Sequence, residues 1–337
     1  MISYILLIPI IASFFITLFL IPSWIKKAKQ IHLIWDDMNK ISLPKISGSG
    51  GINVVLGFII GVLIFIAYRV FYLKTNLFLI EILTILVVIL SLLIIGLIDD
   101  LFGWQKGGLS ISSRLILVAL AAIPLIVINA GKSTISLPFF GIVELGIIYP
   151  LILIPLGIVG ATTAFNFLAG YNGLEAGQGI LILSALSLVS FFTGNPWLSI
   201  VLLCMIASLL AFLLFNFYPA KIFPGDSLTY AVGGLIALAA ILGNFEKIAV
   251  FFFIPYILET VLKTRGKLKK HSFGNPLPDG SLDLKYNKIY GLEHLAILLM
   301  KKFKYKPTEK KVVYLIWAFQ LALIFLGFII FRKGIFL

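Results

Sequence analysis

The amino-acid sequence predicts an all-α, polytopic integral membrane protein with about ten transmembrane helices. Of the 337 residues, 61% are hydrophobic and 12% are charged, whereas soluble domains average about 45–50% and about 25%. Long apolar runs recur along the chain, and the charged residues gather between them. This composition excludes a soluble globular protein, a disordered chain and a disulfide-rich secreted module. The single cysteine, Cys204, excludes an internal disulfide.

The apolar runs define the predicted membrane spans. A span needs about 20 mostly apolar residues, and in lipid its backbone must satisfy its own hydrogen bonds, which requires a helix. The uncharged run 176–220 is long enough for two spans, divided near Pro196. The weakest candidate, 248–262, is short and contains Pro255 and Glu259. The predicted spans are 2–22, 51–72, 78–98, 114–130, 142–165, 176–193, 197–216, 228–243, 248–262 and 312–331.

The basic residues predict the orientation. With both termini outside, 21 of the 27 Lys and Arg residues lie on the inner side, as the positive-inside rule requires. The same distribution argues against nucleic acid as the partner of a chain with net charge +13. Residues 2–25 have no basic n-region, so the first span is expected to be retained. A single transmembrane domain, 1–337, is expected, with inner loops 23–50, 99–113, 166–175, 217–227 and 263–311.

The long inner segment 263–311 contains a different kind of helix. Between Ile289 and Phe303, apolar residues recur at helical spacing beside several lysines, which predicts an amphipathic helix. This helix is expected either to lie on the inner leaflet or to pack on the helix bundle, and the sequence leaves both alternatives open.

Asp99 and Asp100 stand out among the 14 acidic residues because they directly follow the third apolar run. At the C-terminal end of a helix the dipole is negative, so each carboxylate there costs a few tenths to about 1 kcal/mol. One interpretation is a polar helix end that reaches water. The cost favours the other interpretation, in which a cation, a metal or a basic partner lies nearby.

A glycine-rich segment, AFNFLAGYNGLEAGQG at 164–179, joins two apolar spans and carries Asn166, Asn172 and Glu175. Glycine permits positive φ and the close approach of a ligand to the backbone, and Asn-Gly is a turn signal. A plain turn between helices is the simpler interpretation. However, such a turn rarely needs this composition, which favours a ligand-binding loop.

A third segment, 215–234, carries Phe223, Pro224 and Asp226 just before an apolar span. On its own, Asp226 is best interpreted as the N-cap of that span, because Asp is among the preferred capping residues. Phe223 and Pro224 form an apolar shelf that can accept a flat ring.

These three segments lie on the inner side of the predicted topology, so their polar side chains are expected to meet in one cleft. The expected members are Asp99, Asp100, Asn166 and Asp226. Oxygen ligands of this kind suit Mg²⁺ bound together with substrate phosphate. The sequence contains no zinc spacing, P-loop or G-x-S-x-G motif. The residues alone therefore predict an inner, acidic Mg²⁺–phosphate site.

At these segments the sequence resembles the polyprenyl-phosphate N-acetylhexosamine-1-phosphate transferases, which are ten-span enzymes with cytoplasmic active sites. The matching motifs run from about residue 36 to 280: Asp36-Asp37-Met38-Asn39-Lys40, Asp99-Asp100, Asn166 to Gln178, Phe223-Pro224-Gly225-Asp226 and Lys270-His271. The form NGLEAGQ is closer to the archaeal and eukaryotic N-acetylglucosamine enzymes than to the bacterial muramoyl enzyme.

The resemblance implies transfer of N-acetylglucosamine-1-phosphate from UDP-N-acetylglucosamine to a polyprenyl (dolichyl-type) phosphate, with release of UMP. It implies Mg²⁺ as the cofactor, with Mn²⁺ as an alternative. The implied catalytic residues are Asp99, Asp100 and a basic partner, Arg114 or Lys106. The implied metal ligands are Asn166 and Asp226, and the implied uridine contacts are Met38, Gly170, Asn172 and Phe223. The implied diphosphate and sugar contacts are Lys40, Glu175, Lys270 and His271.

The sequence departs from the family pattern at three places. The lysine that usually follows the aspartate pair is replaced by either Lys106 or Arg114, and Arg114 is favoured. Arginine presents a planar fork where lysine presents a point charge. Ser272 stands where a second arginine is common, and Gly48 stands where close eukaryotic members have a glutamate.

Other functions stay open at this point. A transporter also carries polar residues within the membrane, but here the acids gather at one end and no inverted repeat is visible. A member of the same family that uses another UDP-N-acetylhexosamine is the nearer alternative. A single displacement is favoured over a two-step route through a carboxylate such as Asp99.

The expected partners are UDP-N-acetylglucosamine, a polyprenyl phosphate and the lipid bilayer. Nucleic acid is not expected, and a homodimer is an open alternative for the assembly. The expected location is an archaeal or other prokaryotic cell membrane, with the endoplasmic reticulum membrane as the alternative and the active site facing the cytoplasm.

Overall fold

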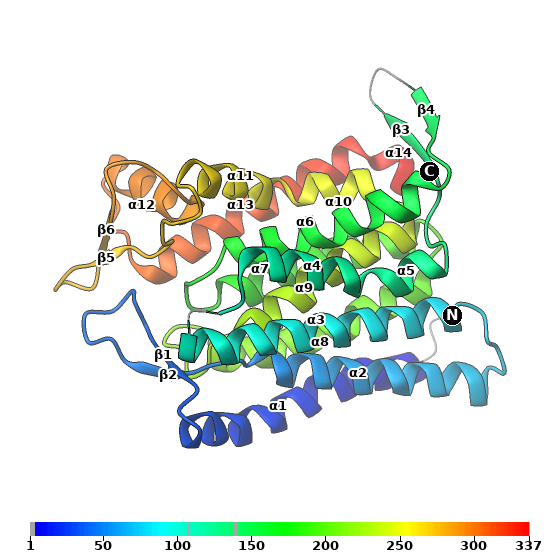
Figure 1. The fold of residues 1–337 in the computed structure, drawn as a ribbon, viewed down its shortest axis with the longest axis horizontal. Helices are drawn as coiled ribbons and strands as arrows, with labels where there is room; N and C mark the ends of the chain where they lie inside the picture. The colour runs from blue at the N-terminus through cyan, green and yellow to red at the C-terminus, as the bar shows by residue number, and fades with distance from the viewer. Residues whose placement is uncertain (1–3, 107, 138–140, 337) are drawn as a thin grey trace.

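Long helices running side by side dominate the computed structural model, which describes residues 4–106, 108–137 and 141–336 (Figure 1). Within these ranges, eight helical stretches are long and apolar enough to span a membrane. They are Tyr4–Gln30, Gly51–Tyr72, Leu79–Gly103, Tyr149–Phe167, Leu174–Phe192, Pro196–Asn216, Asp226–Gly243 and Glu309–Ile330. The predicted class, an all-α polytopic membrane protein, is confirmed.

The structure contains eight long α-helices, six shorter ones and three short strand pairs within the described residues. The long helices are α1 (Leu7–Gln30), α2 (Gly51–Ala67), α3 (Leu79–Lys106), α6 (Ile154–Phe167), α7 (Leu174–Phe192), α8 (Pro196–Asn216), α9 (Asp226–Gly243) and α13 (Glu309–Ile330). The shorter helices are α4 (Ile111–Ala121), α5 (Ile123–Val127), α10 (Glu246–Phe252), α11 (Ile254–Arg265), α12 (Leu292–Lys302) and α14 (Arg332–Phe336). Three antiparallel strand pairs join β1 (Ile34–Asp36) to β2 (Lys45–Ser47), β3 (Thr134–Leu137) to β4 (Gly141–Glu144), and β5 (Asn275–Pro276) to β6 (Leu282–Asp283).

Two of the predicted spans, 114–130 and 248–262, are each built from two short helices. α4 and α5 meet at Ala122, and α10 and α11 meet at Phe253. A proline stands in the first turn of each second helix. Proline lacks the N–H that would continue the ladder and clashes with the preceding turn, so the helix is interrupted. Ten crossings with both termini outside stays a prediction.

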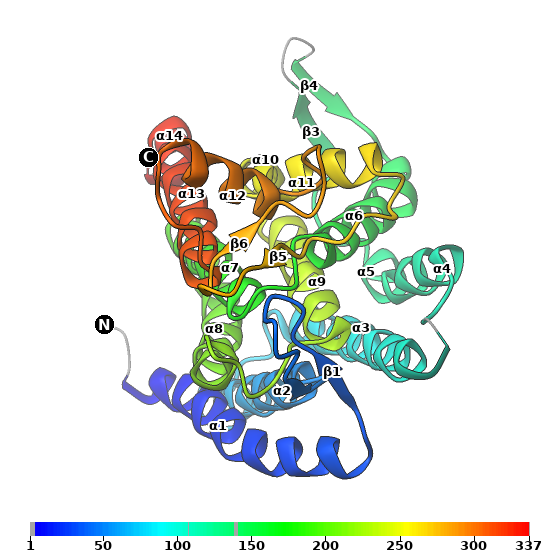
Figure 2. The ribbon, with the colours of Figure 1, turned by 90° about the vertical axis from the view of Figure 1, so that its left-hand side faces the viewer.

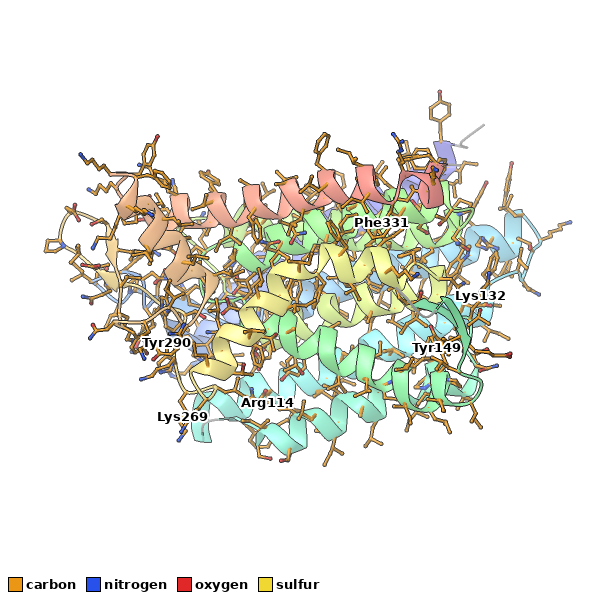
Figure 3. The ribbon with its side chains drawn as sticks, turned by 90° about the horizontal axis from the view of Figure 1, so that it is seen from above. Arg114, Lys132, Tyr149, Lys269, Tyr290 and Phe331 are labelled. Carbon is orange, nitrogen blue, oxygen red and sulfur yellow. The ribbon has the colours of Figure 1, made fainter. Side chains whose placement is uncertain are left out.

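The two ends of the bundle differ in what they carry. In Figure 1 both chain termini lie at one end, whereas β1, β2 and α12 lie at the other. Figure 3 places Lys269 and Arg114 toward the second end and Lys132 toward the first. Residues that the sequence assigned to opposite sides of the membrane therefore lie at opposite ends of the bundle.

α9 occupies the centre of the bundle, with α3, α6, α7 and α8 around it (Figure 2). Gly96 allows α3 to approach the start of α9 closely, because a Cβ at this position would lie 2.4 Å from the carbonyl oxygen of Asp226. α3 continues past the predicted boundary at residue 98 as far as Lys106. The expectation that Asp99 and Asp100 end the helix is therefore wrong, and both lie within α3, against the start of α9.

α12 packs on the bundle, which was one of the two alternatives for the amphipathic segment. Glu293, His294 and Ile297 are buried, while Phe303, just beyond the helix, is 67% exposed. The apolar face of α12 lies against α11 and α13, at the end of the bundle that carries β1 (Figure 1).

Candidate active site

A cavity of about 570 Å³ lies at the end of the bundle that carries β1. Its wall comes from the β1 segment, the end of α3, α4, the loops before α7 and α9, and the segment around residue 273. The predicted site residues in this wall are Met38, Asp99, Asp100, Arg114, Asn166, Gly170, Glu175, Phe223 and Asp226. The fold thus brings together side chains from segments more than a hundred residues apart in the sequence.

The Asp100 carboxylate binds the N-terminus of α9. Its Oδ1 accepts a hydrogen bond from the backbone N–H of Asp226 at 2.7 Å, and its Oδ2 accepts one from Ser227 at 3.3 Å. A carboxylate at this end of a helix dipole is stabilised by about 0.3–1 kcal/mol. The interpretation of Asp226 as the N-cap is wrong, because Gly225 holds that position with φ of 71°. Glycine is required there, since a Cβ would lie 2.3 Å from Asp100 Oδ2.

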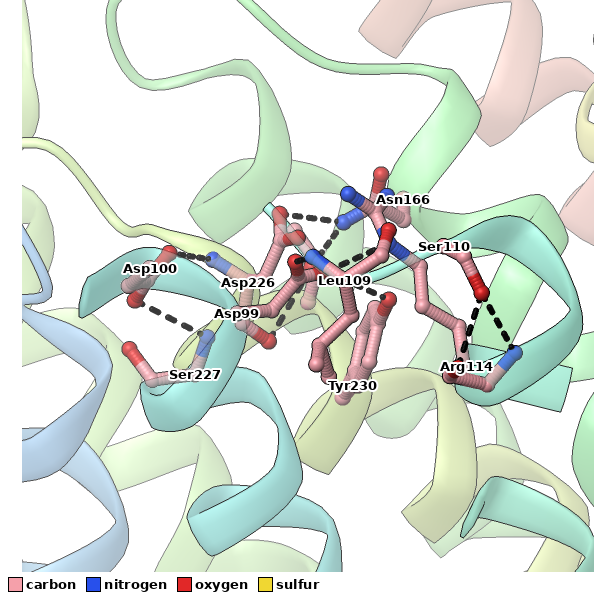
Figure 4. A network of polar contacts seen from close by, with 11 residues as sticks. Asp99, Asp100, Leu109, Ser110, Arg114, Asn166, Asp226, Ser227 and Tyr230 are labelled. Carbon is pink, nitrogen blue, oxygen red and sulfur yellow. Dashed lines mark hydrogen bonds and ion pairs between the residues drawn. The ribbon is translucent and has the colours of Figure 1, made fainter. Parts of the chain in front are cut away.

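Asp99 is held by a cation and two neutral donors (Figure 4). Arg114 Nε lies 2.7 Å from Asp99 Oδ2. The Tyr230 hydroxyl donates to the same oxygen at 3.2 Å, and the backbone N–H of Leu109 donates to Oδ1 at 2.8 Å. Arg114 is therefore a basic partner of Asp99. The side chain of Lys106, the alternative partner, lies outside the described residues.

Asn166 and Asp226 are in direct contact. Asn166 Nδ2 donates to Asp226 Oδ1 at 2.6 Å (Figure 4). It also donates to Thr229 Oγ1 at 2.9 Å. A half-turn of the amide presents its oxygen beside the carboxylate, giving two ligands of the type that Mg²⁺ combines with phosphate oxygens and water. Across the described residues, no cluster of three or more His, Cys, Asp or Glu has metal-binding geometry. Asn166 and Asp226 by themselves offer two ligands, so a cation held by this pair would need further ligands from substrate and water.

The loop between α6 and α7 is shaped by Gly170, whose φ is 106°. A Cβ at this position would lie 2.8 Å from the ring of Phe273. The backbone N–H of Gly170 donates to Glu175 Oε1 at 2.8 Å, and Glu175 is only 4% exposed. Glu175 thus holds the loop backbone. Its expected contact with the diphosphate or the sugar stays a prediction.

Lys40 and Asn172 lie behind the cavity and not in its wall, which differs from the expectation. Lys40 Nζ pairs with Asp37 and lies 3.3 Å from Glu309 Oε2. Asn172 is 3% exposed, and its amide donates to Asp37 Oδ2 at 3.1 Å. The polar groups of both residues are used between loops, which is why they do not face the cavity.

Lys270 and His271 lie beside the cavity. The His271 ring is stacked 6.2 Å from Phe273, which does line the wall. The ammonium group of Lys270 lies over the ring of Tyr286 at 4.9 Å. Their expected contact with the diphosphate and the sugar stays a prediction.

Sequence reasoning missed several residues at this site. Thr229 and Tyr230 follow Asp226 at the helical spacing of one turn, and that spacing could have identified them. Trp35 lines the cavity and packs over Gly48, where a Cβ would lie 1.6 Å from its ring. No glutamate fits at position 48 while Trp35 occupies this place. Glu309 has no sequence signal, since it simply begins the last long helix.

An apolar groove of about 680 Å³ runs between α4, α6, α9, α10 and α11. Small residues of α6 and α9 line it, which leaves space between these helices. Leu115 and Phe167 also line it, and they directly follow Arg114 and Asn166 in the sequence. Residues that are adjacent in the sequence thus line the groove and the acidic cavity at two places.

Comparison with known proteins agrees with this geometry. A model described as glycosyl transferase family 4 matches residues 82–244. The chain is 36% identical over 318 residues to a putative UDP-N-acetylglucosamine–dolichyl-phosphate N-acetylglucosaminephosphotransferase of Saccharolobus solfataricus, covering 94% of this chain and 93% of the relative. A Dictyostelium discoideum protein of that name, without "putative", is 31% identical over 71% of this chain and 66% of its own length. The phospho-N-acetylmuramoyl-pentapeptide-transferase of Halalkalibacterium halodurans is 29% identical over 79% of this chain and 86% of its own length.

Proposed function

Because this chain belongs to glycosyl transferase family 4, the polyprenyl-phosphate N-acetylhexosamine-1-phosphate transferases, we propose that its inner cavity transfers N-acetylglucosamine-1-phosphate. The donor is UDP-N-acetylglucosamine and the acceptor is a polyprenyl phosphate of the dolichyl type. The products are polyprenyl-diphospho-N-acetylglucosamine and UMP. One observation supports the proposal: neighbouring residues, Arg114 with Leu115 and Asn166 with Phe167, line an acidic, phosphate-suited cavity and an apolar groove.

The reaction proceeds by a single displacement. An oxygen of the lipid phosphate forms a bond to the phosphorus that bears the sugar, and the bond from that phosphorus to the bridging oxygen breaks, so UMP leaves with the electron pair. A phosphate monoester is largely ionised near neutral pH, so the attack needs little base catalysis. The main demands on the protein are positioning and charge compensation.

Asn166 and Asp226 would hold Mg²⁺, with Mn²⁺ as the alternative. When bound, the cation offsets negative charge on the diphosphate and on the leaving UMP. Asp100 supports this pair by fixing the first turn of α9, from which Asp226 projects. Asp226 has no cationic side chain among its hydrogen-bond or ion-pair partners in the described part of the chain, which is consistent with a ligand supplying the positive charge.

Arg114 would serve the transferring phosphate. Its Nε is bound to Asp99 and to the carbonyl of Leu109. The described contacts of its side chain otherwise leave the terminal guanidinium nitrogens for an anion, which arginine binds with a planar fork. Asp99 keeps the guanidinium of Arg114 in place. Asp99 thus orients Arg114, and Asp100 orients Asp226 by fixing the first turn of α9.

The two substrates enter from different surroundings. Phe223 is half-buried in the cavity wall with Met38 and Gly170, and we assign the uridine to this wall, with its ring against Phe223. The acceptor's isoprenoid chain would lie in the apolar groove, which places its phosphate near Arg114. The protein would act in a cell membrane of the prokaryotic type, with the cavity facing the cytoplasm, since most of its cations lie at that end.

The test uses purified protein in detergent and lipid, a polyprenyl phosphate, Mg²⁺ and UDP-N-acetylglucosamine labelled in the sugar. We expect label in the organic phase with equimolar UMP. The label should be lost with EDTA and in Asp226→Asn, and kept in the control Glu81→Gln, a half-buried acid at the other end of the bundle. Release of UDP in place of UMP would contradict sugar-phosphate transfer. Competition by unlabelled UDP-N-acetylhexosamines identifies the preferred sugar.

A further inference from the structure

Glu309, the first residue of α13, contacts two segments that are distant in sequence. The residue is 4% exposed. Its Oε1 accepts a hydrogen bond from the backbone N–H of Asn172 at 2.9 Å, and its Oε2 lies 3.3 Å from Lys40 Nζ. One carboxylate therefore joins the loop after β1 to the loop before α7.

Asp37 closes the same contacts from the other side. It is 3% exposed, pairs with Lys40 and accepts from Asn172 Nδ2 at 3.1 Å. Lys40 thus lies between two carboxylates, and Asn172 is bound by the same two, through its backbone to Glu309 and through its side chain to Asp37. We name these four residues the loop clamp. Its single lysine faces two buried acids, so loss of Lys40 would remove the cation that both carboxylates contact.

Within the loop clamp, Asp37 lines the cavity, whereas Lys40, Asn172 and Glu309 do not. Met38 follows Asp37 in the sequence, and Gly170 precedes Asn172 by two residues; both line the cavity. Asn39, which is 5% exposed, adds a parallel link, since its Nδ2 donates to the carbonyl of Gly170 at 2.9 Å. The loop clamp therefore sets the distance between the loop after β1 and the loop before α7, and with it the separation of Met38 and Gly170 in the cavity wall.

We propose that Glu309 is a positioning residue for the nucleotide half of the site. By holding the N–H of Asn172 and the ammonium of Lys40 together, it sets the spacing between Met38 and Gly170 at which the nucleoside diphosphate sugar is bound. The identity of that ligand rests on the proposed function, whereas the docking of the two loops does not. The groove for the lipid lies between other helices, so the acceptor is outside the influence of Glu309.

The experiment separates the two substrates. Glu309→Ala removes both contacts and leaves a buried N–H without an acceptor. We expect it to raise KM for UDP-N-acetylglucosamine by about tenfold, with KM for polyprenyl phosphate and kcat changed by less than about twofold. Glu309→Gln keeps an acceptor for Asn172 and loses the charge facing Lys40, so its effect should be intermediate. The control is Lys311→Met, which removes an exposed cation from the same turn of α13 and should match wild type.

A double-mutant cycle tests the contact itself. The double variant Glu309→Gln with Lys40→Met should raise KM for UDP-N-acetylglucosamine by less than the product of the two single increases. The reason is that each change breaks the same ion pair, Lys40–Glu309. Equal increases in KM for both substrates, a loss confined to kcat, or fully multiplicative effects would overturn the positioning role. If Glu309→Ala does not fold, Glu309→Gln and the double-mutant cycle test the positioning role of Glu309 in its place.

A binding measurement keeps this inference separate from the proposed function. UDP should raise the melting temperature of wild type and Lys311→Met, and should raise that of Glu309→Ala much less at the same concentration. If wild type binds UDP but forms no lipid product, the proposed transfer is wrong. The comparison of melting temperatures between wild type and Glu309→Ala still tests the positioning role in that case. Equal stabilisation of all variants by UDP, or none in wild type, would overturn the inference.

Discussion

The carboxylate of Asp100 on α3 caps the helix that Asp226 begins, with 2.7 Å between Asp100 Oδ1 and the backbone nitrogen of Asp226. Two acids that repel each other in isolation are thus placed in different roles. One carboxylate is used by the N-terminus of α9, and the other faces the cavity with Asn166. The site is built on the contact between α3 and α9, where Gly96 permits close approach.

Replacement of Asp100 separates stability from activity. Asp100→Ala removes the cap and should lower the free energy of unfolding by about 1–2 kcal/mol, while Asp100→Asn keeps an acceptor and should cost less. Asp100→Ala should lose most transfer activity, because the first turn of α9 positions Asp226, and Asp100→Asn should lose less. Thermal unfolding and UMP release measured on the same preparations check this, with Glu81→Gln as the control. Full activity in Asp100→Ala would contradict the capping role.

Arg114 is expected to carry the role of the family's lysine. Arg114→Met leaves Asp99 without its cation and should lower kcat by about 100-fold, the size typical of losing one electrostatic stabiliser. Arg114→Lys should recover part of the rate, because it restores charge without the fork. Steady-state kinetics of Arg114→Met beside Lys106→Met decide between the two positions. A larger loss in Lys106→Met would assign the role to that residue.

Gly48 is required by the ring of Trp35. In Gly48→Ala the new Cβ would lie 1.6 Å from that ring, so Trp35 must move within the cavity wall. We expect a loss of about 1–3 kcal/mol in the free energy of unfolding, together with a higher KM for the donor. Gly334→Ala, where no atom lies within 4 Å, is the control. Combining Gly48→Ala with Trp35→Leu should restore stability; an unchanged loss in the pair would show that another contact is responsible.

Much of the fold and part of the site can be predicted from sequence, because a polar residue in an apolar context stands out. Asp99, Asp100 and Asp226 are visible for this reason, and hydropathy locates their helices. The breaks at Ala122 and Phe253 were missed because apolar composition continues across them, although Pro124 and Pro255 mark both.

Other features of the site depend on which residues meet in space. Asp226 precedes an apolar run and satisfies the composition of an N-cap, yet the capping carboxylate comes from α3. The family resemblance implied that Lys40 contacts the diphosphate or the sugar. The charge of Lys40 is used by Asp37 and Glu309. The partner Glu309 lies 269 residues further along the chain, at a distance no local pattern reports.

Glu293 should make stability depend on pH. This residue of α12 is 0% exposed, and neither carboxylate oxygen has a hydrogen-bond partner in the described part of the chain. Burial raises its pKa well above the usual 4.5, and nearby Glu259 raises it further, whereas Lys263 lowers it. Glu175 of α7 also faces it and raises the pKa.

The folded state therefore keeps a proton that the unfolded chain releases. This contribution is complete below the unfolded pKa and is lost as pH rises toward the folded pKa, by up to about 1.4 kcal/mol per pH unit. Glu293→Gln has no such proton, so its melting temperature should fall less between pH 5 and 9 than that of wild type, while Glu81→Gln should follow wild type. Parallel curves for wild type and Glu293→Gln would mean that Glu293 is ionised in the folded protein, with Lys263 as its counter-ion.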